Sequence, residues 1–248
     1  MYPMNENELI PDHDAKMHHQ TPSRLIAIGD IHGQLDMLNR LLNSIVPTKM
    51  DQFVFLGDYI DRGKNSKGVI DRLIQFRCEF PHTVFIRGNH DQMLLDVLVE
   101  LGARADMRLR DISSKYHASS PETDLEIFLS NGGNETLRSY RLKDVTDIPT
   151  EHIRFLNGTR LWWQYENFVF VHAGVAPNLP LEMQDPFDLL WERLSPPGKD
   201  GSIHVVGHHP TTGEPYFEPG RYSLDTGAVY GQTLTACDVR NRQIWQVR

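Results

Sequence analysis

Short apolar runs, each leading to a glycine and a polar residue, recur along the sequence. They lie at 25–28, 53–56, 83–86, 168–171 and 203–206. Such runs, rich in Val, Ile and Phe and bounded by glycine, are typical of buried strands. Between the first three runs, and after the third, apolar residues recur at helical spacing over 35–45, 69–74 and 93–101. Successive strands roughly 30 residues apart fit βαβ units, so the pattern predicts an α/β fold with parallel strands.

The remaining segments depart from this pattern. Residues 103–160 are more charged and less periodic, with helical patterns at 124–129 and 150–156. We interpret them as a helical, cap-like insertion, which either lies over the active crevice and affects substrate choice or is only a packing appendage. Alternation at 222–226, 233–236 and 243–247 predicts antiparallel strands in a second sheet that closes the core, and 189–193 predicts a short helix or strand.

Domain organisation follows from composition. Residues 1–22 are polar and contain proline, which predicts a disordered leader before a single domain at 23–248. The net charge of -8 disfavours binding to a nucleic-acid duplex, because that needs a basic face. No run approaches the roughly 18 apolar residues of a membrane helix. Two cysteines form no disulfide framework. We therefore expect a cytoplasmic protein whose partners include neither a duplex nor a membrane.

Potential metal ligands follow the predicted strands. The segment 57–63 (GDYIDRG) places two acids and an arginine in a glycine-bounded turn, which suggests that Asp58 lies between two metal ions with Asp61 and Arg62 beside it. The carboxyl ends of parallel strands meet at one edge of a sheet, so ligands remote in sequence can converge there. The candidate ligands are Asp30, His32, Asp58, Asn89, His172 and His208.

This donor set contains oxygen and nitrogen atoms but no thiolate. It suits Mn, Fe or Zn rather than a calcium cage or an iron–sulfur cluster. Two divalent ions about 3.5–4 Å apart can share a carboxylate and a water, and the paired charge makes hydroxide available at neutral pH. We therefore expect two divalent metal ions as cofactors, with Mn preferred over Fe or Zn.

Taken together, these motifs resemble a known family. The motifs at 29–33 (GDIHG), 57–63 (GDYIDRG), 88–91 (GNHD), 172–174 (HAG) and 207–208 (GH) are similar to the signature set of the phosphoprotein phosphatase (PPP) branch of the calcineurin-like metallophosphoesterases. The resemblance covers about residues 24–240. It is closest to the small bacterial serine/threonine phosphatases, which also carry segments like 189–193 (LLWER) and 225–229 (DTGAV). It implies a calcineurin-like β-sandwich with flanking helices and a helical insertion.

The resemblance also implies which residues hold each metal. One metal would be held by Asp30, His32 and Asp58. The second would share Asp58 and add Asn89, His172 and His208. The family usually has threonine where this chain has His209, so that residue is either a group beside the ligands or a sign of ambiguous register. We expect His208 to be the ligand.

Four further residues receive catalytic roles by resemblance. His90 would be the general acid that protonates the leaving alkoxide, oriented and charged by Asp61. An adjacent carboxylate raises the pKa of a histidine and favours its protonated form. Arg62 would bind the phosphate through its planar fork of donors. Arg193 would be a second phosphate-binding arginine, or else only a surface salt-bridge partner.

The implied function is hydrolysis of phosphoserine and phosphothreonine, with phosphotyrosine as a further substrate, by direct attack of a hydroxide that bridges the two metals. The substrate would be a phosphorylated protein or a small phosphoester. The alternative is a symmetrical dinucleoside polyphosphate hydrolase that splits diadenosine tetraphosphate. That related family shares the metal motifs, but its second motif usually departs from Asp61-Arg62-Gly63. A third reading, an inactive phospho-ligand binding module, would be expected to have lost a ligand or the acid.

Overall fold

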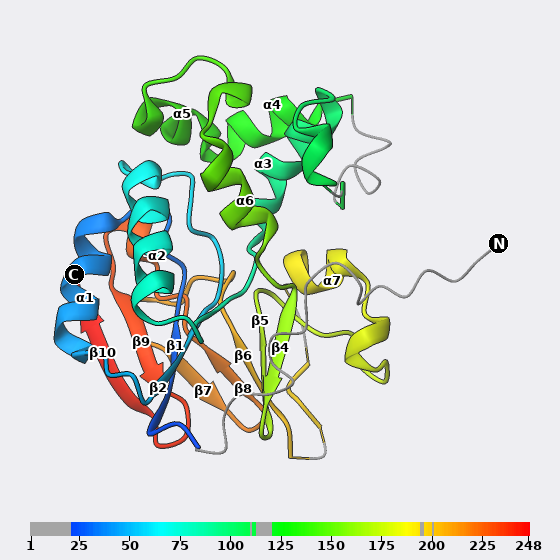
Figure 1. Cartoon of the computed structure of the whole chain (residues 1–248). Helices are drawn as coiled ribbons and strands as arrows, with labels where there is room; N and C mark the ends of the chain where they lie inside the picture. The colour runs from blue at the N-terminus through cyan, green and yellow to red at the C-terminus, as the bar shows by residue number, and fades with distance from the viewer. Residues whose placement is uncertain (1–20, 110, 113–120, 194–195, 200) are drawn as a thin grey trace.

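The computed structural model describes residues 21–109, 111–112, 121–193, 196–199 and 201–248. Almost all of the expected leader at 1–22 lies outside these ranges. Within them, the strands form two five-stranded sheets that pack face to face (Figure 1). This is the predicted β-sandwich with flanking helices. Within the same ranges, no helix combines the length and apolar character that crossing a membrane requires.

The first sheet contains the predicted βαβ units. Its strands, in spatial order, are β10 (Gln243–Val247), β9 (Leu234–Asp238), β1 (Arg24–Ile28), β2 (Asp51–Phe55) and β3 (Val84–Phe85). β1, β2 and β3 pair in parallel, whereas β9 pairs antiparallel with both β1 and β10. The connecting helices are α1 (Leu35–Ile45) and α2 (Ser66–Glu79), and α3 (Asn89–Glu100) follows β3.

The second sheet has a parallel centre and antiparallel edges. Its order is β4 (Trp162–Tyr165), β5 (Phe168–Val171), β6 (Ile203–Val206), β8 (Arg221–Ser223) and β7 (Tyr216–Glu218). β5, β6 and β8 run parallel to one another. The expectation that the last two C-terminal strands belong to this sheet is wrong. The β9–β10 hairpin instead joins the first sheet, where it pairs with the edge of β1 that would otherwise present open backbone groups.

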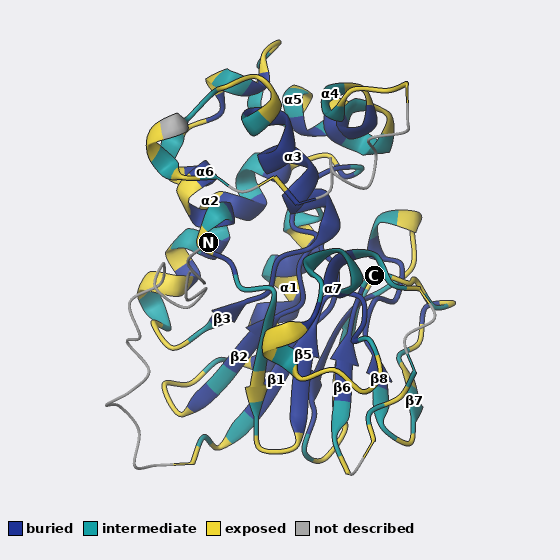
Figure 2. Cartoon of the chain, turned by 90° about the vertical axis from the view of Figure 1, so that its right-hand side faces the viewer, coloured by how far each residue is buried: buried dark blue, intermediate teal, exposed yellow. Residues whose placement is uncertain are grey.

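The apolar runs are buried on both faces. In β1, Leu25 and Ala27 face the second sheet, while Ile26 and Ile28 pack under the helices. Strands covered on both faces read as continuous apolar segments rather than as alternating ones. The dark, buried strands in the middle of the molecule show this layering in Figure 2. The outer face of the second sheet packs against Leu189 of helix α7 (Pro186–Trp191).

The two helices predicted between 103 and 160 form as α4 (Asp124–Phe128) and α6 (Thr150–Asn157). The helix α5 (Asn134–Tyr140) was not predicted, and single turns lie at Ala105–Met107, Leu129–Gly133 and Val145–Asp147. Together with α3 they stand beyond one end of the two sheets (Figure 1). Segment 189–193 contributes the end of α7, a helix that Asp185 caps by accepting from the Phe187 amide at 2.9 Å.

Candidate active site

The loops that follow the parallel strands of both sheets converge at one end of the sandwich. After β1 and β2, the amides of Ile31 and His32 both donate to the carbonyl of Asp58, at 3.2 and 2.8 Å. From the second sheet, His172 Nδ1 lies 2.8 Å from the carbonyl oxygen of Leu56, which ends the β2 segment. The first sheet thus supplies the frame into which the histidines of the second sheet reach.

Backbone strain is concentrated in these loops. His32, Asp58, Asp61, Arg62 and His208 have φ angles of 42°, 51°, 70°, 63° and 64°. This left-handed region is unfavourable for residues with a Cβ, and it persists only where the surroundings enforce it. Five candidate site residues share the feature, which is typical of positions selected for chemistry rather than for stability.

Asp91 holds two of the loops together. Its carboxylate accepts from the amides of Asp58, Tyr59 and Gly88 at 2.9, 3.1 and 2.9 Å. From the sequence alone, Asp91 is predicted to cap a helix beginning near Gln92, because Asp is well suited to that position. That prediction is wrong in position. The helix begins at Asn89, and Asp91 lies inside its first turn. From there it can satisfy its own helix terminus and the 57–59 turn at once.

Two histidines turn Nε2 toward the centre of the site. His32 Nδ1 lies 2.8 Å from the carbonyl of Ile60, and His172 Nδ1 makes the same contact with Leu56. A carbonyl only accepts, so each Nδ1 carries a proton, and in the neutral ring Nε2 is then the nitrogen with the lone pair. His172 Nε2 then lies 2.9 Å from Asn89 Oδ1, another acceptor. Two acceptors at this distance fit a cation between them.

One carboxylate oxygen of Asp30 is also left without a hydrogen-bond donor among the described residues. Its Oδ2 accepts from the His208 amide at 3.0 Å, but its buried Oδ1 has no hydrogen-bond partner within the part of the chain that the structure describes. Burial, together with the charges of Asp225 and Asp58, raises the pKa of Asp30 well above its usual range. Gly207 passes so close that a Cβ there would collide with Oδ1. A bound cation would stabilise the ionised form of the Asp30 carboxylate and contact its free oxygen.

His208 completes the picture from the second sheet. Its Nδ1 lies 3.1 Å from Asn89 Oδ1, and no described residue forms a hydrogen bond with its buried Nε2. Burial, with the charge of His172, lowers the pKa of His208 to about 3, so the ring is neutral and able to act as a ligand. His209, by contrast, is exposed. The geometry therefore turns His208, and not its neighbour, toward the other candidate ligands.

Two groups of donor atoms around Asp58 are close enough to hold ions. His32, Asp58 and His90 form one, and Asp58, His172 and His208 form the other, each with all donor atoms within 4.8 Å. Although burial opposes it, the three neighbouring histidines His172, His90 and His32 lower the pKa of Asp58 well below its usual range. Asp58 is shared by both groups, as a bridging ligand would be. The residues present fit a pair of divalent cations.

The guanidinium of Arg62 contacts one of these potential ligand atoms. Arg62 Nη1 lies 3.1 Å from His32 Nε2. That nitrogen also lies 3.2 Å from Asp58 Oδ2, and although burial opposes it, Asp58 raises the pKa of His32, so positive charge is favoured at this position. Arg62 also lies over the ring of Tyr230, with Cζ 5.8 Å from the ring centre. It therefore stands at the boundary between the buried donors and the surface.

His90 is paired with Asp61, as expected. His90 Nδ1 lies 2.9 Å from Asp61 Oδ2, and the His90 amide donates to Asp58 Oδ1 at 3.0 Å. The expected rise in the pKa of His90 is wrong, however. Burial lowers it well below its usual range, although Asp58 opposes this, and burial raises the pKa of Asp61 to about 8. Desolvation of both partners outweighs their attraction, so the pair favours one shared proton over two separate charges.

An open pocket of about 630 Å³ lies next to Arg62. The lining residues are Arg62, Leu129, Ser130, Asn131, Gly132, Asn134, Glu135 and Tyr230. Most of them come from the 103–160 segment, which thereby contacts the candidate site instead of packing elsewhere. Arg193 does not line this pocket; it is exposed, and its charge contributes to the lowered pKa of His208.

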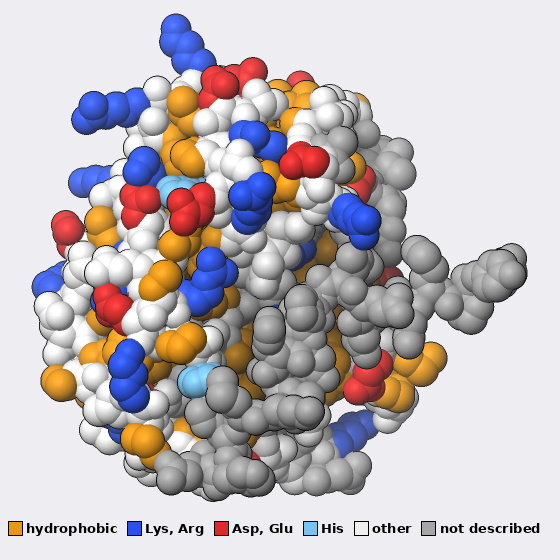
Figure 3. Space-filling model, viewed as in Figure 1, with side chains coloured by type: hydrophobic (Ala, Val, Ile, Leu, Met, Phe, Trp, Pro, Cys, Tyr) orange, Lys and Arg blue, Asp and Glu red, His pale blue; other side chains and the backbone are white. Residues whose placement is uncertain are grey.

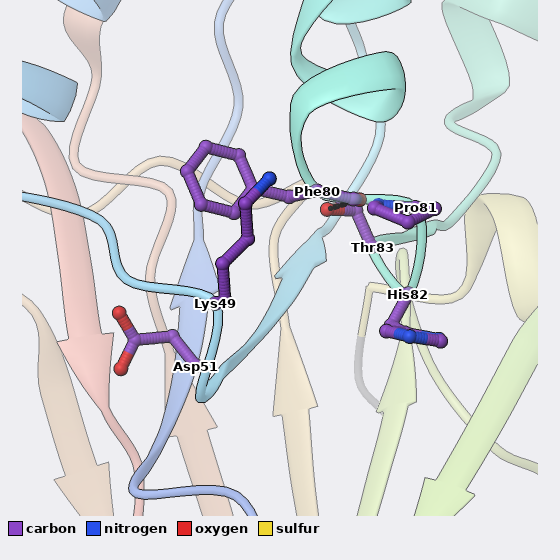
Figure 4. Close-up of a pocket in the computed structure, with 6 residues that line it drawn as sticks. All are labelled: Lys49, Asp51, Phe80, Pro81, His82 and Thr83. Atoms are coloured by element: carbon purple, nitrogen blue, oxygen red, sulfur yellow. Dashed lines mark hydrogen bonds between the residues drawn. The ribbon is translucent and has the colours of Figure 1, made fainter. Parts of the chain in front are cut away.

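A second, smaller pocket lies at the opposite end of the first sheet. It has a volume of about 190 Å³ and is lined by Lys49, Asp51, Phe80, Pro81, His82 and Thr83 (Figure 4). None of the candidate ligands lines it. On the face seen in Figure 3, basic and acidic side chains are interspersed over the described surface.

Sequence reasoning missed three buried polar residues of the site. Asp225 follows β8 in the same way that the candidate ligands follow their strands, and it is close enough to affect the pKa of Asp30. The strand-end rule could have found it. Asp91 was assigned only a local cap. Thr136 donates to Asp61 from a distant helix, and no local pattern marks it.

The comparisons with known proteins agree with the geometry. A family profile described as calcineurin-like phosphoesterase matches residues 23–231. Serine/threonine-protein phosphatase 1 of Salmonella typhimurium is 30% identical over 86% of this chain and 90% of its own length. Serine/threonine-protein phosphatase 5 of Arabidopsis thaliana is 26% identical over 48% of this chain, but the match spans only 24% of the plant protein.

Among solved structures, a candidate diadenosine tetraphosphatase superposes with a TM-score of 0.65 at 22% identity, covering 93% of this chain and 95% of that one. At this identity the likeness concerns the fold alone.

Proposed function

The chain belongs to the calcineurin-like phosphoesterase family, and we propose that it is a two-metal phosphomonoesterase acting on phosphoserine and phosphothreonine. It is a phosphoric ester hydrolase by its family and its relatives. The observation that carries the two-metal part of the proposal is the set of facing acceptors around Asp58. His172 Nε2 and Asn89 Oδ1 are 2.9 Å apart, and Asp30 Oδ1 has no partner among the described residues.

The proposed metal site uses the six candidate ligands. Asp30, His32 and Asp58 would hold one cation, and Asp58, Asn89, His172 and His208 the other. Bound there, two divalent ions, with Mn preferred, would supply an activated water nucleophile and neutralise the phosphoryl oxygens. The absence of thiolates and the mixture of imidazole and carboxylate donors support ions of intermediate hardness.

Arg62 would bind the phosphate. Its guanidinium is held close to the donors by the strained 57–63 turn, and its backbone amide donates to the Gly132 carbonyl at 3.2 Å. A fork of N–H donors can contact two phosphoryl oxygens and orient the ester for in-line attack. Arg193, exposed beside His208, is the proposed second contact.

His90 would protonate the leaving alkoxide. A serine alkoxide is a poor leaving group, and a positioned proton donor is worth about 10²–10⁴ in rate. Before substrate binds, burial keeps the His90–Asp61 pair at one shared proton. A phosphate dianion beside the ring favours its charged form. Substrate binding would therefore supply the condition under which His90 becomes an acid.

The open pocket supports a peptide substrate. It adjoins Arg62 and is lined by the amides of Asn131 and Asn134. An open, polar surface beside the phosphate site suits an extended chain that flanks a phosphorylated residue. We propose that the 103–160 segment contributes to substrate choice through this pocket.

The test is a side-by-side assay of one Mn²⁺-loaded preparation. Its substrates are a phosphoserine peptide, a phosphotyrosine peptide, p-nitrophenyl phosphate and diadenosine tetraphosphate. The proposal predicts that kcat/KM is highest for the phosphoserine peptide. Predominant turnover of diadenosine tetraphosphate would overturn this proposal in favour of a dinucleoside polyphosphate hydrolase. A candidate diadenosine tetraphosphatase has the same fold. Absence of any phosphoester hydrolysis would leave only a binding module.

A further inference from the structure

We infer that Thr136, in the helical segment above the sheets, is a positioning residue that fixes Asp61 and, through it, His90. The inference rests on the proposed function, in which His90 is the general acid. Thr136 is fully buried, as are Asp61 and Ser66. It lies in α5, 75 positions away from Asp61 in the sequence.

The hydrogen bonds leave Thr136 little freedom. Its hydroxyl donates to Asp61 Oδ1 at 2.7 Å and accepts from the Asp61 amide at 2.9 Å. Because its single proton goes to Asp61, the 3.0 Å contact with Ser66 must be a bond donated by Ser66. Ser66 therefore fixes the rotation of the threonine hydroxyl, which in turn fixes the carboxylate.

The two oxygens of Asp61 are divided between two partners. Oδ1 receives the Thr136 hydroxyl, and Oδ2 faces His90 Nδ1 at 2.9 Å. With Oδ1 held, the carboxylate cannot rotate away from the imidazole. The ring then keeps Nδ1 toward Asp61, which leaves Nε2 as the nitrogen that can carry a proton to the leaving group.

Segment 129–140, which contains α5, contacts residues 61–67 at two further points. The Arg62 amide donates to the Gly132 carbonyl at 3.2 Å, and the Lys67 amide donates to Ser139 Oγ at 2.8 Å. Gly132 has a φ of 110°, and a Cβ there would lie 2.6 Å from the Arg62 nitrogen. The helical segment thus carries part of the proton-donor apparatus, besides lining the pocket.

The test compares leaving groups. p-Nitrophenolate departs without protonation, whereas a serine alkoxide requires it. Thr136→Val keeps the volume and removes the hydroxyl, so we expect kcat on a phosphoserine peptide to fall by about 10-fold to 100-fold, since small misplacement of a catalytic group costs this much. kcat on p-nitrophenyl phosphate should change by less than about threefold, with KM and bound Mn²⁺ unchanged.

Three other variants make the result specific. Thr136→Ser keeps the hydroxyl and should restore the phosphoserine rate. Ser139→Ala removes a neighbouring contact of the same helix without touching Asp61, and should leave the ratio of the two rates unchanged. His90→Asn sets the size of the effect when the acid itself is lost. If Thr136→Val does not fold, Thr136→Ala replaces it with the same expectation.

The outcomes separate the inference from the proposed function. Equal losses on both substrates in Thr136→Val, while His90→Asn affects the peptide selectively, would overturn the role of Thr136 alone. No rescue by Thr136→Ser would do the same. If His90→Asn itself shows no selectivity, the general acid is misassigned and both ideas fail.

Discussion

The two ends of β1 and β2 carry charged side chains in opposite circumstances. At their amino ends, Arg24 donates to both oxygens of Asp51, at 2.8 and 2.6 Å, and Asp51 also accepts from the Thr48 amide at 2.7 Å. Beyond their carboxyl ends, Asp30 Oδ1 is buried without a partner among the described residues, and nearby His172 Nε2 lies 2.9 Å from Asn89 Oδ1.

The pKa directions follow the same division. Burial opposes it, but the hydrogen bonds from Arg24 and Thr48 lower the pKa of Asp51. At the other end, burial and neighbouring acids raise the pKa of Asp30. One end of the sheet is satisfied within the chain and contributes to stability. The other needs something from outside the chain, and this incompleteness is what identifies it as the site.

The largest loss of activity is expected for Asp58→Asn, beyond the carboxyl end of β2. It removes the ligand shared by both donor groups, so we expect loss of bound metal and a fall in kcat/KM of roughly 10³-fold or more, because paired ions supply several kcal/mol of transition-state stabilisation. Metal analysis and phosphopeptide kinetics measure the two effects. Wild-type rates in this variant would refute the bridging role.

The next largest effect is expected for His90→Asn. Turnover of a phosphoserine peptide should fall about 10²-fold or more, since proton donation is lost. Metal content, read by elemental analysis of the dialysed protein, should stay at the wild-type value because no proposed ligand is removed. Collapse of the metal content would instead make His90 a ligand, as its place in one donor group allows.

Asp30→Asn tests the comparison through stability. In metal-free protein it replaces a buried carboxyl group whose charged form burial disfavours, and we expect the free energy of unfolding to rise by roughly 1 kcal/mol. Activity should be lost in the same variant. Denaturant unfolding in chelator gives the stability, and destabilisation of the metal-free protein would mean that Asp30 is satisfied within the chain.

Asp51→Asn at the amino end should do the reverse. Activity stays, while the free energy of unfolding falls by about 1–2 kcal/mol at pH 7 through lost charge-assisted hydrogen bonds. A lowered folded pKa contributes stability above the unfolded pKa of about 3.9, and that stability disappears as pH falls through the folded value. The difference between variant and wild type should therefore shrink below about pH 4.

The exposed pair Glu135–Arg138 provides a matched control for that variant. Arg138→Gln should change the free energy of unfolding by no more than about 0.5 kcal/mol, because exposed pairs contribute little. An equal effect of the two substitutions would remove the distinction drawn for the amino end.

Much of the site could be predicted because its chemistry repeats a structural rule. Asp30, Asp58 and His172 each follow a buried apolar run, and parallel strands bring such positions to one edge. The loops of both sheets do meet there. The choice of His208 over His209 stays a prediction, which the exposure of His209 supports.

What could not be predicted depends on contacts between distant segments. The β9–β10 hairpin carries an ordinary strand pattern that does not reveal which sheet it joins. Asp91 reads locally as a cap, and its bonds to the 57–59 turn come from packing. The pKa of His90 was predicted in the wrong direction because a neighbouring carboxylate is visible in the sequence and the depth of burial is not.

The central claim is that the potential ligand atoms around Asp58 bind two divalent ions, and that these ions make the protein a phosphomonoesterase. Titration of metal-free protein with Mn²⁺, followed by the rate of phosphoserine-peptide hydrolysis, tests it directly. The account predicts that activity rises to saturation at two equivalents of Mn²⁺ per chain. Full activity in the metal-free protein, or saturation at a single equivalent, would contradict it.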